Sequence, residues 1–125
     1  MIHIGESFSQ TIIVTTEQTA QAMKSGNLPV LSTPYMIACM ENTALTLLSK
    51  YLEANEDSVG IFVEAHHQKA SKIGEQITYT ATITNVENKK IEFEIHAKNM
   101  NNAIIGTCSH TRFIIDPKLF MEKLK

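Results

Sequence analysis

Apolar and polar residues alternate with a period of two along most of the second half of the chain. The clearest run is Ile77–Thr84, in which apolar residues alternate with four threonines. Similar alternation occurs in Val59–His67 and in Ile91–Lys98, and a longer run from Ala103 to about Ile115 follows a turn at Asn99–Asn102. Because successive side chains of a strand point to opposite faces, these runs predict half-buried strands.

The first half of the chain has a helical period at its centre. The longest helix is expected from Pro34 to about Leu52, with the Thr33 hydroxyl as its N-cap and proline at the first helical position. A β-branched strand is expected at Thr11–Thr15, a short helix at Glu17–Lys24 and a terminal helix at Lys118–Lys125.

The expected order is a strand, a helix and a run of hairpin-connected strands, within one domain spanning residues 1–125. Connections this short favour an antiparallel sheet. The long helix is the only element able to cover one face, which predicts an α+β domain with one helix lying on a curved sheet. Open sheet edges favour pairing with a second copy, so we expect a homodimer, with a dimer of dimers as the larger alternative.

Composition excludes several classes of function. With 43% hydrophobic residues, 19% charged residues and a net charge of -2, the 125-residue chain is typical of a globular protein without a nucleic-acid role. No run of about 20 apolar residues predicts a membrane span, and no secretory signal is visible, so we expect a cytoplasmic protein. Cys39 and Cys108 have no metal-binding spacing and are expected to be reduced and packed. We expect no metal ion and no cofactor.

Glu41 is the unexpected residue of the long helix. At about 100° per residue, it falls inside the apolar arc, between Ile37 and Leu45. Three interpretations remain open: a carboxylate that reaches solvent past small neighbours, an ion pair with a lysine or with Arg112, which is the only arginine, or a functional group. An inward carboxylate in an apolar setting is how proteins make general acids and bases. The apolar arc contains Ile37, Ala44, Leu45, Leu48 and Leu52, and the opposite side contains Asn42, Thr43, Thr46, Ser49 and Lys50.

His67 is the predicted partner of Glu41. By alternation it continues the inward set of Ile61, Val63 and Ala65, whereas His66 faces outward. A lone inward histidine is more often a hydrogen-bonded core residue, but an inward histidine together with an inward glutamate favours acid–base chemistry, within one chain or across a dimer interface. The histidines lack metal-ligand spacing, and no nucleophile elbow or phosphate-binding loop occurs.

Three segments together carry a resemblance to a known family. They are STPYMIACMENTALTLL (residues 32–48), SVGIFVEAHHQKAS (58–71) and GTCSHTRFII (106–115). In combination they resemble the hotdog-fold thioesterases, most closely the fluoroacetyl-CoA thioesterase-like branch, from about Gly5 to Asp116. The resemblance implies a long helix wrapped by an antiparallel sheet, two subunits joined edge to edge, and active sites at the dimer interface.

The resemblance also implies the reaction and its residues. An acyl-CoA thioester would be hydrolysed to a carboxylic acid and free CoA. The family's catalytic residues match Thr33, Glu41 and His67, and the glycine whose N–H polarises the thioester carbonyl matches Gly60. Glu41 would attack the carbonyl or activate water, His67 would handle the proton, and Thr33 would orient Glu41 or the substrate.

One segment departs from the family pattern. Fluoroacetyl-specific members carry aromatic lid residues shortly before the helix, but Met23–Pro29 contains no aromatic residue. A different short or medium acyl group is therefore expected. The departure also keeps open a non-catalytic hotdog module that binds acyl-CoA or a related ligand. A hotdog dehydratase is a third and less favoured interpretation.

Overall fold

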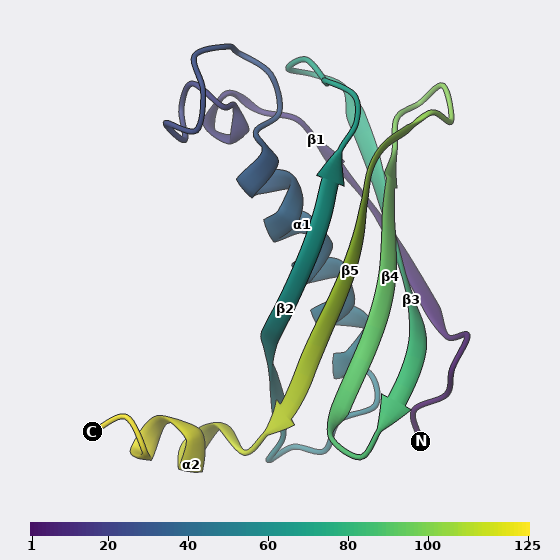
Figure 1. The fold of residues 1–125 in the computed structure, drawn as a ribbon, viewed down its shortest axis with the longest axis vertical. Coiled ribbons are helices and arrows are strands. Elements are labelled where there is room, and N and C mark those ends of the chain that lie inside the picture. Colours follow the sequence, from purple (N-terminus) through teal and green to yellow (C-terminus); the bar gives the residue numbers. More distant parts are fainter.

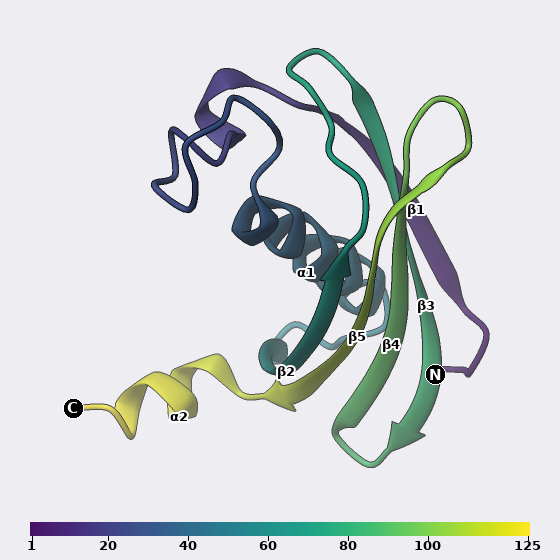
Figure 2. The same ribbon diagram turned by 45° about the horizontal axis from the view of Figure 1, so that its top comes forward.

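The computed structural model describes all 125 residues, and an antiparallel sheet of five strands curves around one long helix (Figures 1 and 2). The expected α+β architecture, with one long helix on a curved antiparallel sheet, is confirmed. No helix is both long and apolar enough to pass through a membrane. The elements are β1 (Ser7–Ile13), the 3-10 turn η1 (Thr16–Gln18), α1 (Thr33–Ser49), β2 (Asp57–His67), β3 (Gln76–Glu87), β4 (Lys90–Lys98), β5 (Ile104–Ile115) and α2 (Pro117–Glu122).

The strand order in the sheet is β1-β3-β4-β5-β2, with every neighbouring pair antiparallel. Hairpins join β3 to β4 and β4 to β5, as predicted. β2 pairs with β5 and not with β3, its successor in the chain. The hairpin expected between β2 and β3 is therefore wrong. The two edges of the sheet are therefore β1 and β2 (Figure 1).

The inner face of the sheet follows the predicted alternation. Every expected inward position of β3 and β4 is buried, and the intervening threonines, glutamates and lysines lie on the outer face. Burial of each large apolar side chain, such as isoleucine or phenylalanine, contributes about 1.5–3 kcal/mol to the free energy of unfolding. The buried positions are Ile77, Tyr79, Ala81, Ile83, Ile91, Phe93, Ile95 and Ala97.

The buried face of α1 is rotated from the predicted one. Thr43, expected on the polar side, is fully buried, because its hydroxyl donates to the Cys39 carbonyl (2.7 Å) and accepts from Nε2 of Gln10 (2.8 Å). Glu41 is half-buried at the flank of this face rather than at its centre. The buried residues of the helix are Met36, Cys39, Met40, Thr43, Ala44, Leu47 and Leu48.

Several predicted boundaries are wrong. The N-cap of α1 is Ser32, whose side chain accepts from the backbone N–H of Tyr35, and Thr33 is the first helical residue. The helix predicted at Glu17–Lys24 is reduced to the turn η1, followed by an irregular loop. The first strand runs from Ser7 to Ile13, earlier than expected.

Candidate active site

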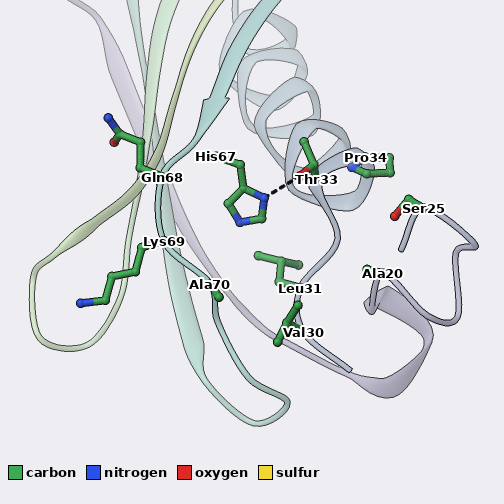
Figure 3. Close-up of a pocket in the computed structure, with 10 residues that line it drawn as sticks. All are labelled: Ala20, Ser25, Val30, Leu31, Thr33, Pro34, His67, Gln68, Lys69 and Ala70. Atoms are coloured by element: carbon green, nitrogen blue, oxygen red, sulfur yellow. Dashed lines mark hydrogen bonds between the residues drawn. The ribbon is translucent and has the colours of Figure 1, made fainter. Parts of the chain in front are cut away.

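The start of α1 and the end of β2 meet at one hydrogen bond. Oγ1 of Thr33 lies 2.8 Å from Nδ1 of His67, and the two side chains point toward each other in Figure 3. Because Ser32 provides the cap, the Thr33 hydroxyl is free for this contact. A hollow of about 280 Å³ opens at the pair, and its other lining residues are Ala20, Ser25, Val30, Leu31, Pro34, Gln68, Lys69 and Ala70.

A β-bulge controls which face of β2 carries His67. Gly60 pairs with Arg112 and Phe62 pairs with Thr111, so Ile61 is the additional residue. Ile61 was expected inward, but the bulge leaves it 54% exposed. Beyond the bulge the alternation is as predicted, with His67 half-buried and His66 exposed.

Burial favours the neutral form of His67. It lowers the pKa of the ring, and the backbone of Lys69 opposes only part of that shift. Nε2 is shielded from solvent and makes no hydrogen bond of standard geometry within the chain. The ring therefore has one nitrogen fixed by Thr33 and one nitrogen without a partner in the chain.

Glu41 lines a second hollow, of about 440 Å³, between α1 and the first half of β2. Gly60 forms the facing wall at very close range. A Cβ added to Gly60 would lie only 2.9 Å from Oε2 of Glu41. Glycine therefore permits the carboxylate to approach the β2 backbone. The other lining residues are Ala38, Asn42, Leu45, Ser58, Val59 and Arg112.

Behind Gly60 lies a buried cluster on β5 made by His110 and Arg112. Arg112 donates from Nε to Oγ of Ser58 (2.8 Å), from Nη2 to the Ser58 carbonyl (3.0 Å) and from Nη1 to Nε2 of His110 (3.2 Å). Burial lowers the pKa of Arg112, and the nearby Glu41 and Asp57 carboxylates oppose that shift. Glu41 and Arg112 form no ion pair, so the interpretation of Glu41 as an ion-pair residue is wrong.

The four residues predicted from sequence fall into two groups within one chain. Thr33 and His67 share one hollow, and Glu41 and Gly60 share the other. Thr33 and Glu41 are eight residues apart in α1, about 12 Å along the helix axis. Gly60 lies at the bulge of β2 and His67 at the end of the strand, roughly 20 Å apart along it. Glu41 and His67 therefore do not meet within the chain.

His110 lies next to Gly60, and the sequence did not identify it as a functional residue. It is 1% exposed and lies directly under Gly60, where an added Cβ would stand 3.1 Å from its Cε1. A signal was present, because His110 and Arg112 are two positions apart and therefore share the inner face of β5. No group of three or more metal-ligating side chains forms anywhere in the chain.

Proteins similar to this chain include thioesterases. The model of the family described as fluoroacetyl-CoA-specific thioesterase matches residues 14–118. The fluoroacetyl-CoA thioesterase of Streptantibioticus cattleyicolor is 25% identical over 130 residues, covering 99% of this chain and 93% of that protein. A solved structure of a fluoroacetyl-CoA thioesterase superposes with a TM-score of 0.92 at 25% identity, covering 99% of this chain and 96% of that one.

A protein from a second organism has the same fold. A thioesterase-superfamily protein of Thermus thermophilus superposes with a TM-score of 0.90 at 26% identity, covering 99% of this chain and 90% of that one. The match of the family model spans most of the chain, and the structural similarity spans nearly all of it. The chain is thus a hotdog-fold thioesterase that belongs to the fluoroacetyl-CoA-specific thioesterase family.

Proposed function

We propose that this thioesterase hydrolyses an acyl-CoA in a site assembled from two subunits, with Glu41 and Gly60 from one and Thr33 and His67 from the other. The observation that carries the proposal is the separation of these two pairs within one chain. Each pair has the chemistry of half a hydrolytic site. In one pair the Glu41 carboxylate faces the β2 backbone at Gly60. In the other pair the Thr33 hydroxyl orients the His67 imidazole.

Pairing of two β2 edges would bring the halves together. β2 is a free edge of 11 residues, and Ile61 and Phe62 on it are 54% and 52% exposed. Antiparallel pairing about a two-fold axis near Val63 would bring the His67 end of each β2 alongside the Gly60 end of the partner subunit's β2. The same pairing occurs twice by symmetry, so a homodimer would have two sites.

The chemistry follows from the groups in each half. Glu41 either takes a proton from the attacking water or attacks the thioester carbonyl itself, giving an anhydride that water then cleaves. The Gly60 N–H donates to the oxygen on which negative charge develops. His67, oriented by Thr33, passes the proton released by water to the CoA sulfur. In the first route that proton comes by way of Glu41, and in the second it is released when water cleaves the anhydride.

The acyl group is proposed to be short or medium and is not assigned to fluoroacetate. A variant of the fluoroacetyl-CoA thioesterase has been solved with fluoroacetate and CoA, which supports a CoA thioester as the substrate class. In this chain the segment before α1 presents Met23 and Leu28, 40% and 64% exposed, and no aromatic side chain.

A panel of acyl-CoA esters tests the proposal, with release of free CoA as the readout. Wild-type protein should hydrolyse at least one short or medium ester, and Glu41→Gln should remove most of that activity while leaving the unfolding temperature unchanged. Equal rates for the two proteins would exclude Glu41. No hydrolysis of any ester, together with thermal stabilisation by acyl-CoA, would instead support a binding module.

A further inference from the structure

We propose that His110 is a positioning residue that fixes two parts of the site at once, the β-bulge carrying Gly60 and the guanidinium of Arg112 beside Glu41. This inference rests on the proposed hydrolytic function. His110 does not touch substrate, because it is 1% exposed beneath Gly60 and its ring stacks on Phe93, with centroids 6.1 Å apart.

The hydrogen bonds of His110 require a single tautomer. Nδ1 lies 2.8 Å from the carbonyl oxygen of Phe62, which can only accept, so Nδ1 carries the proton. Nε2 lies 3.2 Å from Nη1 of Arg112, which can only donate, so Nε2 is the acceptor. Only the neutral ring protonated on Nδ1 satisfies both contacts.

Each contact holds a part of the site. The Phe62 carbonyl belongs to the bulge, whose register shift between Gly60 and Phe62 turns Gly60 toward the helix. Arg112 is held on its other sides by Ser58 alone. Removal of the His110 acceptor would free Nη1, the guanidinium nitrogen that a Cβ added at Gly60 would approach to 3.4 Å.

Protonation of His110 would break the contact with Arg112 and keep the Nδ1–H donation to the Phe62 carbonyl. The charged ring has no acceptor, and it would place a second cation against Arg112. Burial lowers the pKa of His110, and Arg112 on the same strand lowers it further. Glu41 on α1 and the Phe62 backbone on β2 oppose the shift. Phe93 on β4 and Val63 on β2, the two cross-strand neighbours of His110, carry no charge.

Three substitutions separate the two contacts. Gln at position 110 can still accept from Arg112, Asn can still donate to Phe62, and Leu can do neither. We expect His110→Gln and His110→Asn, which each keep one contact, to lower kcat a few-fold, and His110→Leu to lower it by roughly tenfold, with KM little changed. Protonation of His110 should lower kcat as the pH falls, and this part of the acid dependence should be absent in His110→Gln.

The outcomes separate this inference from the proposed function. Wild-type kcat and an unchanged pH profile in a folded His110→Leu protein would overturn the positioning role, as would a His110→Gln protein as impaired as His110→Leu. An NMR spectrum of the histidine nitrogens in wild-type protein provides a test that needs neither activity nor a folded variant. A neutral ring with its proton on Nδ1 supports the role, and a neutral ring with its proton on Nε2 overturns it.

Discussion

Oγ1 of Thr33 and Nδ1 of His67 are 2.8 Å apart, so the first residue of α1 is bonded to the last residue of β2. Both residues belong to regular elements rather than to loops, and each backbone position is therefore set by helix or sheet hydrogen bonds. The bond gives the His67 ring one orientation, with Nε2 as the nitrogen left for a further group.

Removal of the Thr33 hydroxyl should reduce turnover without unfolding the protein. Thr33→Val keeps the shape of the side chain but frees the ring, and we expect kcat to fall about 10- to 100-fold, because small misplacements of catalytic groups have effects of this size. Thr33→Ser should remain within a few-fold of wild type. Steady-state kinetics on the best acyl-CoA measures the difference, and equal losses in both variants would contradict it.

Two inactive variants should complement each other. Glu41→Gln and His67→Ala subunits, unfolded and refolded together, form mixed dimers in which one site has both wild-type residues. Random mixing makes half of the dimers mixed, so about a quarter of wild-type activity should return. Each variant refolded alone should stay inactive, and His66→Ala, on the outer face of β2, should be active throughout. No recovery on mixing would place Glu41 and His67 of the same chain in one site.

A methyl group at Gly60 should damage both stability and activity. In Gly60→Ala the new Cβ would stand 2.9 Å from Oε2 of Glu41 and 3.1 Å from Cε1 of His110, and the His110 ring is too tightly packed to move freely. Crowding of this kind costs about 1–3 kcal/mol. Urea unfolding should report that loss, and Glu64→Ala on the same strand serves as the control. A Gly60→Ala protein as stable and active as wild type would contradict the close approach.

The free energy of unfolding should fall on mild acidification. Burial holds the pKa values of His67, His96 and His110 below their ordinary value of 6.5. Below pH 6.5 the unfolded chain therefore binds more protons than the folded one, so stability is complete above that pH and decreases as the pH falls. Urea unfolding at about pH 7.5 and about pH 5.5, where carboxylates remain ionised, measures the effect. Identical stabilities at the two pH values would refute it.

The sequence predicts the sheet better than it predicts the helix face. In Ile77–Ile83 every alternate residue is apolar and the pairing with β4 is regular, so the pattern and the structure agree. Thr43 misleads the helical wheel, because local partners satisfy its hydroxyl and permit burial. A hydropathy pattern contains no information on such partners.

The orientations of the candidate site residues follow from the sequence, but their grouping does not. Alternation correctly predicted that His67 faces inward and His66 outward, and the wheel kept Glu41 off the polar side. That Thr33 rather than Glu41 contacts His67 depends on the distance along α1, and on Ser32 taking the role of N-cap. The role of His110 depends on hydrogen bonds to a backbone carbonyl and a guanidinium, which periodicity does not encode.

The bulge in β2 makes pairing, rather than side-chain identity, the important property of position 61. Inner residues are even-numbered before it, at Ser58 and Gly60, and odd-numbered after it, at Val63, Ala65 and His67. Deletion of Ile61 would remove the bulge and leave one regular alternation, in which Gly60 and His67 both still face inward. If Ile61 instead entered the regular pairing, with the Gly60 end held in place, His66 would turn inward and His67 outward. The exclusion of one residue from the ladder therefore decides which of the two neighbouring histidines reaches the inner face.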